Sequence, residues 1–149
     1  MSRATGAFVL LGCSVDPGQD FQLAEAVFDE GYFYCAVEPM LFAQGCGSGD
    51  PGQGEDGRGC HFSVTAFRLT DYGPPRVGDN CDGNQPGSGP PAAARNNYSS
   101  AQLFMDRDPD RAPLLQRPTH TTAHPRIVID IDSDEADVIR QWATQFSSR

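Results

Sequence analysis

The sequence predicts a mostly α-helical domain that begins and ends with amphipathic helices and has long Gly- and Pro-rich loops between them. Two observations support this prediction. Apolar residues recur at helical spacing near both ends of the chain, and much of the middle is rich in the 16 Gly and 12 Pro. The length of 149 residues corresponds to one domain, with an ordered core of roughly 100 residues once these loops are set aside.

Residues 1–12 are interpreted as a secretory signal, because one Arg precedes a short apolar run that cannot span a bilayer. The ending "LLGC" resembles the lipobox of bacterial lipoproteins, in which the cysteine after the cleavage site receives the lipid. We therefore expect a lipidated Cys13, a tether over residues 13–20 and a domain over 21–149. The expected location is the envelope of a Gram-negative bacterium, as a periplasmic or outer-membrane lipoprotein. The alternative is a buried apolar strand that contains a free cysteine.

The first helix is expected to begin at Asp20, a residue type that favours helix N-caps. Gly31 is expected to break or bend this helix, and Pro39 marks the start of a second helical turn. The first apolar stripe contains Phe21, Leu23, Ala24, Val27 and Phe28, and the second turn contains Val37, Met40, Leu41 and Phe42.

The middle of the chain carries weaker signals. Residues 62–69 suit a short helix or an extended segment, and residues 73–96 are expected to be a surface loop or linker. A short helix is expected within 97–105. Residues 106–126 are punctuated by Pro and should be irregular, and residues 127–131 form a possible strand.

The closing helix is the clearest element. Asp132 is the expected N-cap, with Glu135 three residues later in the capping-box arrangement. Its expected apolar face consists of Ile139, Trp142, Ala143 and Phe146.

Cys46 and Cys60 flank thirteen residues that are mostly Gly, Asp and other polar types, and His61 follows directly. A c-type haem is attached by thioether bonds from two cysteines, and the histidine after the second cysteine is aimed at the iron. The chemistry requires two sulfurs within reach of the two vinyl groups, so a Gly-rich insertion that bulges into solvent is compatible with it. A disulfide between the two cysteines that closes a flexible loop is the alternative.

Three segments resemble the cytochrome c-like monohaem lipoprotein domains of the deltaproteobacterial and planctomycete type. The segments are "VEPMLFAQGC" followed by Cys60-His61, "APLLQRPTHTTAHPR" and "VIRQWATQF". The resemblance implies a cytochrome c-like fold with one covalent haem c, attached here through an extended C-x13-C-H motif. It also implies an electron carrier that is not an enzyme and that exchanges electrons with a partner protein.

By its order in the resembling segment, His124 is the expected iron ligand opposite His61, and Pro125 would stiffen its backbone. His120 is the first alternative and Met105 the second. Met40 is assigned to the core. The expected apolar walls of the haem pocket are Phe28, Leu41, Phe62, Phe67, Leu114, Leu115 and Trp142.

With Cys13 on lipid and Cys46 and Cys60 on haem, Cys35 and Cys81 remain and would form a disulfide. Without haem, four mature cysteines allow three connectivities and the sequence does not choose among them. The rival functions are a haem-free, disulfide-stapled surface lipoprotein with a binding or structural role, and a haem enzyme or sensor with an open sixth position.

Other classes of function find less support. The net charge of −9 at pH 7 repels nucleic acid, which excludes that partner. No G-x-S-x-G motif points to a hydrolase. The acidic run 130–137 lacks the spacing and Gly of an EF-hand loop, so helix capping explains it better. Two histidines four residues apart would suit zinc on a helix, but Pro118 and Pro125 disfavour a helix there.

Overall fold

The computed structural model describes residues 27–47, 61, 67–119, 121–122, 124 and 127–146. The elements run in the order α1 (Glu30–Tyr32), the π-helical segment η1 (Phe33–Val37), α2 (Glu38–Ala43), the 3₁₀ helix η3 (Val77–Asn80), β1 (Cys81–Asp82), β2 (Gln85–Pro86), α3 (Ala92–Gln102), the 3₁₀ helix η4 (Pro109–Arg111), α4 (Pro113–Gln116) and α5 (Asp134–Ala143).

The prediction of a mostly α-helical, cytochrome c-like fold is wrong. Helices account for 47% of the described residues, and β1 and β2 form a small antiparallel sheet with Cys81 opposite Pro86. Pro and Gly keep most helices short because Pro removes a backbone donor and Gly favours turns. At the hairpin turn, Gly83 has a φ of +57°, a conformation that favours glycine over other residues.

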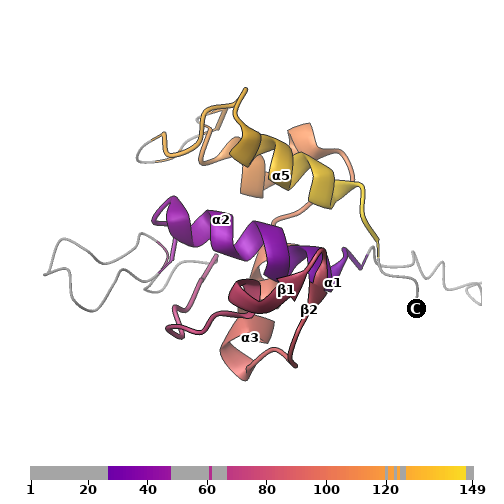
Figure 1. Ribbon diagram of the computed structural model, residues 1–149. Coiled ribbons are helices and arrows are strands. Elements are labelled where there is room, and N and C mark those ends of the chain that lie inside the picture. Colours follow the sequence, from indigo (N-terminus) through magenta and orange to yellow (C-terminus); the bar gives the residue numbers. More distant parts are fainter. Residues whose placement is uncertain are drawn as a thin grey trace, which may run out of the picture.

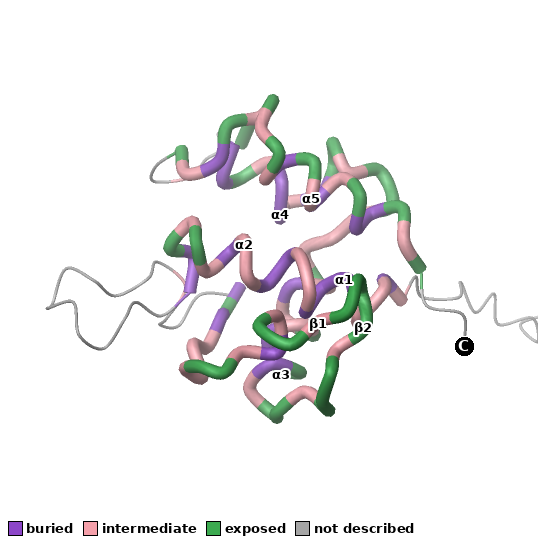
Figure 2. The backbone as a smooth tube through the Cα atoms, viewed as in Figure 1, coloured by how far each residue is buried: buried purple, intermediate pink, exposed green. Residues whose placement is uncertain are grey.

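The helical run α1–η1–α2 occupies the middle of the molecule, with α5 on one side and α3 with the hairpin on the other (Figure 1). Asp29 caps this run, since its carboxylate accepts from the N–H of Tyr32 at 2.6 Å. Phe33 is fully buried and packs against Trp142 at 5.2 Å and Tyr98 at 5.5 Å, which joins α5 and α3 to the central run. Figure 2 shows the hairpin and outer loops as the more exposed parts.

The second helical turn is confirmed as α2, with Pro39 in its first turn. Residues 20–26 of the expected first helix lie outside the described residues. Phe28 is not helical, because it pairs as an isolated antiparallel bridge with Phe146. Gly31 does not break the helix but lies within α1. A Cβ there would meet the carbonyl oxygen of Asn84 at 2.3 Å, so glycine permits the hairpin to approach.

The disulfide between Cys35 and Cys81 is confirmed, with an S–S distance of 2.02 Å. It joins η1 to the start of the hairpin. Residues 73–96, expected as a loop or linker, therefore contain η3, the hairpin and the first residues of α3. The expectation was wrong because its Gly and Pro residues serve as turns and helix starts within ordered structure.

The remaining expectations are met in part. A helix does cover part of 97–105, but α3 begins earlier, directly after Pro91. The described residues of 127–131 contain no strand; instead, the N–H groups of Val128 and Ile129 both donate to the carbonyl of Pro118.

The closing helix is confirmed as α5, but its N-cap is Ser133, which accepts from the N–H of Ala136 at 3.3 Å. Ile139, Trp142 and Ala143 are buried as expected, whereas Phe146 lies beyond the helix and is 46% exposed.

Candidate functional site

A mostly apolar cleft lies at the C-terminal end of α2, with an empty volume of about 500 Å³ that includes open solvent. The residues that line it are Leu41, Gln44, Gly45, Cys46, His61, Phe67, Phe104, Pro113, Leu114, Arg117, Pro118, His124 and Val128. Three of the predicted haem-binding residues, Cys46, His61 and His124, thus line a single cleft.

A glycine turn at the end of α2 places Cys46 in the wall. The N–H of Cys46 donates to the carbonyl of Leu41 at 2.9 Å, and that of Gly45 donates to Phe42 at 3.0 Å. With a φ of +70° at Gly45, these two bonds form a Schellman motif, which ends a helix and reverses the chain. Cys46 is consequently folded back beside Leu41 and is only 7% exposed.

The Gly45→Ala substitution is expected to lower the free energy of unfolding by about 1–2 kcal/mol, because a side chain disfavours the left-handed conformation. A Cβ at Gly45 would meet no atom within 4 Å, so the cost is conformational and not steric. Urea denaturation followed by circular dichroism measures it. Gly89→Ala is the control, since the Cβ there also meets nothing within 4 Å and its φ is not left-handed. Equal effects at both glycines would contradict this account.

His61 is held in the cleft through both its backbone and its ring. Its N–H donates to the carbonyl of Cys46 at 3.3 Å, and its own carbonyl accepts from Leu69 at 3.3 Å. Its Nδ1 lies 3.2 Å from the carbonyl oxygen of Phe67, whose ring packs edge-on at 4.7 Å. A carbonyl oxygen only accepts, so Nδ1 carries the proton and the lone pair of the neutral ring is on Nε2.

Electrostatics favour this neutral form. Burial is the largest effect and lowers the pKa of His61 below its ordinary value. The neighbouring His124 and Arg117 lower it further, against the opposing effect of the hydrogen bond to the Phe67 carbonyl. A neutral imidazole with one nitrogen anchored to a backbone carbonyl is the arrangement that metal-binding histidines usually adopt.

The bond between His61 and Cys46 bears directly on the attachment motif. In the short C-x-x-C-H form, the first cysteine and the histidine are four residues apart, the span of one α-helical N–H to C=O bond. Here the same two backbone groups are bonded although the chain between them carries a long insertion. Cys60 and most of that insertion lie outside the described residues.

The opposite wall is built around α4. The N–H of Leu114 donates to the carbonyl of Phe104, and the N–H of Val128 donates to the carbonyl of Pro118. The ring of His124 lies 6.1 Å from that of His61, centroid to centroid, with 28° between their planes. His61 and His124 therefore line one cleft, and their role as iron ligands stays a prediction.

The structure does not place the alternative iron ligands in the cleft. His120 lies outside the described residues. Met105 and Met40 are partly buried against the core and do not line the cleft.

Of the residues expected as pocket walls, Leu41, Phe67 and Leu114 line the cleft. Phe28, Leu115 and Trp142 are buried in the core but do not line the cleft, and Phe62 lies outside the described residues. Phe104, Val128 and Arg117 were missed. Phe104 falls within the short helix expected over 97–105, which gave no sign of a cleft. The other two belong to segments whose packing depends on contacts between distant residues.

Among the residues that the structure describes, no group of three or more His, Cys, Asp or Glu side chains could hold a metal ion. Within the same part of the chain, no helix has the length and apolar character needed to cross a membrane. Comparison of the chain with protein-family models, with curated proteins and with solved structures found no match.

Proposed function

We propose that the cleft holds one covalently attached haem c and that the protein carries single electrons in the cell envelope. The observation that supports this most is the hydrogen bond from the His61 N–H to the Cys46 carbonyl. It brings the two ends of the extended motif together as an ordinary helical turn does in the short motif. The proposal does not depend on a cytochrome c-like fold.

The cleft offers three of the four donors that a haem c would need, and the fourth, Cys60, lies outside the described residues. Cys46 and Cys60 would form the thioether bonds, His61 would bind the iron through Nε2, and His124 would be the second ligand. Phe67 orients the His61 ring and fixes its tautomer. Leu41, Phe104, Leu114 and Val128 supply an apolar surround, which lowers the local dielectric and keeps water away from the ligands.

The haem, when bound, supplies the one-electron chemistry through its iron. The chain's own contribution is to hold the ligands, to keep His61 neutral and to leave part of the cleft open for electron exchange. The disulfide between Cys35 and Cys81 suits an oxidising compartment such as the cell envelope.

Spectroscopy of the purified protein tests the proposal. The protein is produced in a host with cytochrome c maturation, and its pyridine haemochrome spectrum and stepwise reduction in the presence of mediators are recorded. We expect a covalent c-type haem that takes up one electron per chain reversibly. A colourless protein from a host in which other c-type cytochromes mature would overturn the proposal and favour the haem-free, disulfide-stapled lipoprotein.

The lipid anchor is a separate part of the proposal, since residues 1–26 lie outside the described residues. The wild-type protein should partition with membranes because acyl chains on Cys13 anchor it, and Cys13→Ser should be soluble or remain unprocessed. Membrane fractionation and the intact mass decide this. A wild-type protein found in the soluble fraction with Met1 retained would show that the signal has been misassigned.

A further inference from the structure

We infer that the rim of the cleft is a docking surface for a redox protein with a basic face. The inference rests on the proposed function, because it assigns the partner of the same site. It is carried by two features that the haem ligands do not explain: exposed apolar side chains beside the cleft, and a concentration of carboxylates around them.

The apolar part flanks α4. Among the described residues, the exposed large apolar side chains are Leu103, Ile127 and Phe146, at 77%, 61% and 46% exposure. Phe146 is accounted for by its bridge with Phe28 and by the guanidinium of Arg107 over its ring.

The core contacts that account for Phe146 do not account for Leu103 and Ile127. Leu103 and Ile127 each precede a residue of the cleft wall, Phe104 and Val128. The N–H of Leu114, in α4, donates to Phe104, and the N–H of Val128 donates to Pro118, two residues after α4, so both wall residues are attached to this short segment. Two solvent-exposed apolar side chains beside one opening form the apolar centre that transient interfaces use.

The acidic part lies on the segments that follow Leu103 and Ile127 in the chain. Residues 106–111 and 130–140 contain eight carboxylates and three arginines, which is more than half of the chain's net charge of −9. Arg140 joins the two segments, because it pairs with Asp137 at 2.8 Å, approaches Asp110 at 4.0 Å and donates to the carbonyl of Ile131.

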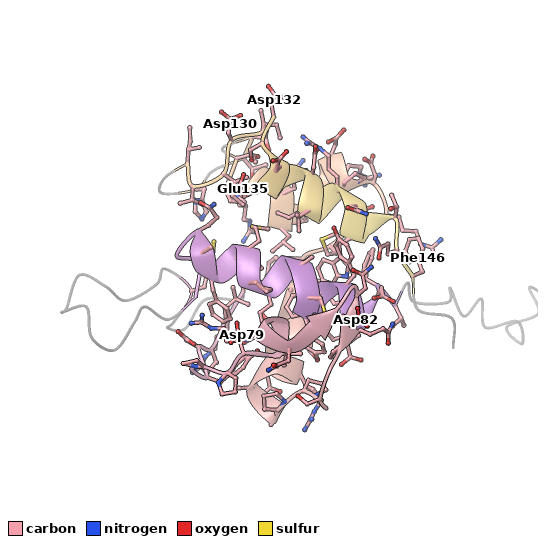
Figure 3. All side chains as sticks on the ribbon, in the orientation of Figure 1. Asp79, Asp82, Asp130, Asp132, Glu135 and Phe146 are labelled. Atoms are coloured by element: carbon pink, nitrogen blue, oxygen red, sulfur yellow. A yellow bond between two sulfur atoms is a disulfide. The ribbon has the colours of Figure 1, made fainter. Side chains whose placement is uncertain are left out.

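This acidic surface reaches the cleft. Glu135 accepts from the side chain of Gln44, which lines the cleft, at 3.3 Å. Asp130 and Asp132 project from the same end of the molecule as Glu135 (Figure 3).

The charge selects the kind of partner. A second copy of this chain, an anionic membrane and a nucleic acid are all repelled by such a rim. A Lys- and Arg-rich protein face is attracted to it, and steering of this kind raises association rates by about 10- to 1,000-fold at low salt. Arg117 is the basic residue of the cleft wall, and its guanidinium lies over the Phe104 ring at 5.4 Å.

Matched charge variants test the inference. Asp130→Asn with Asp132→Asn removes two charges at the rim. Asp79→Asn with Asp82→Asn removes two on the other side of the central helical run (Figure 3). Asp130 and Asp79 each accept a backbone N–H, at 2.9 and 2.7 Å, and asparagine retains that acceptor. The two pairs thus differ in position and not in the kind of change.

The probe is a basic mitochondrial-type cytochrome c, and stopped-flow absorption measures its electron exchange with the haem-loaded protein at several ionic strengths. We expect the rim pair to lower the second-order rate constant about tenfold at low salt, and the distant pair to change it less than about twofold. Equal effects of the two pairs, or a rate that rises with salt, would overturn the inference.

A second measurement separates this inference from the haem proposal. The reduced, diamagnetic probe is titrated into the ¹⁵N-labelled protein, and amide shifts are followed by NMR whether or not haem is attached. Shifts confined to the segments of Leu103, Ile127 and Asp130 support the docking surface even if the haem proposal fails. If the haem-loaded protein shows no shifts there, the docking surface is contradicted and the haem proposal stands. The same holds if ultracentrifugation shows that the protein dimerises through this face.

Discussion

His124→Ala is expected to convert the oxidised iron from low spin to high spin and to let carbon monoxide bind the reduced form. The reason is that His124 lines the same cleft as His61, with ring centroids 6.1 Å apart, and two imidazoles keep haem iron low-spin. Absorption and electron paramagnetic resonance spectra of the purified variant measure the spin state. The wild-type spectrum should lack the methionine-to-iron charge-transfer band.

His120→Ala is the matched control, since it removes a histidine four residues away and should leave the spectrum unchanged. A high-spin His120→Ala together with a low-spin His124→Ala would move the ligand assignment to His120. If neither variant changes the spectrum, Met105 becomes the ligand, although it does not line the cleft in this structure. A high-spin wild type that binds carbon monoxide would favour the sensor or enzyme function.

Glu38→Ala is expected to lower the free energy of unfolding by about 4 kcal/mol, because one buried and one partly buried hydrogen-bond donor lose their acceptor and a cavity is left. Glu38 is 1% exposed and accepts from Asn97 and from the hydroxyl of Tyr72, each at 2.7 Å. Urea denaturation followed by circular dichroism measures the loss. Glu135→Ala is the control, because Glu135 is only partly buried and accepts a longer bond from Gln44; less than about 1 kcal/mol is expected there.

The same carboxylate should make stability depend on pH. Burial raises the pKa of Glu38, although the hydrogen bonds from Asn97 and Tyr72 and the charge of Arg76 lower it. A group whose pKa is raised by folding stabilises the protein below its unfolded pKa, near 4.5, and this contribution is lost as the pH rises through the folded pKa. Glu38→Gln should remove that part of the slope. An unchanged pH profile in Glu38→Gln would contradict the assignment.

Local patterns predicted local structure well. α2 and α5 followed from apolar spacing, capping residues and Pro39, and the cleft residues Leu41, His61 and His124 were expected at a common site. Cysteine arithmetic predicted the disulfide. The N-cap of α5 moved by one residue because Asp132 and Ser133 are both good caps, and the choice depends on how the preceding turn approaches the helix.

The fold class failed where contacts between distant residues decide the structure. Phe28 pairs with Phe146, and the carbonyl of Asp29 accepts from the indole of Trp142, contacts that no local pattern encodes. The Gly- and Pro-rich segment around residues 77–86 became ordered because the disulfide and Gly31 allow the hairpin to pack against α1. The wall residues Phe104 and Val128 are placed by backbone bonds to Leu114 and Pro118. Glu38 is buried within a helix that was expected only from its apolar residues.

The intact mass of the mature protein, made in a host with cytochrome c maturation, tests the central claim most directly. We expect each chain to carry the added mass of one haem, and we expect the haem to stay attached after acid–acetone extraction. Cys46→Ala and Cys60→Ala should each leave at most one thioether bond. A wild-type chain without the added mass, from cells in which a C-x-x-C-H control protein carries its haem, would contradict the account.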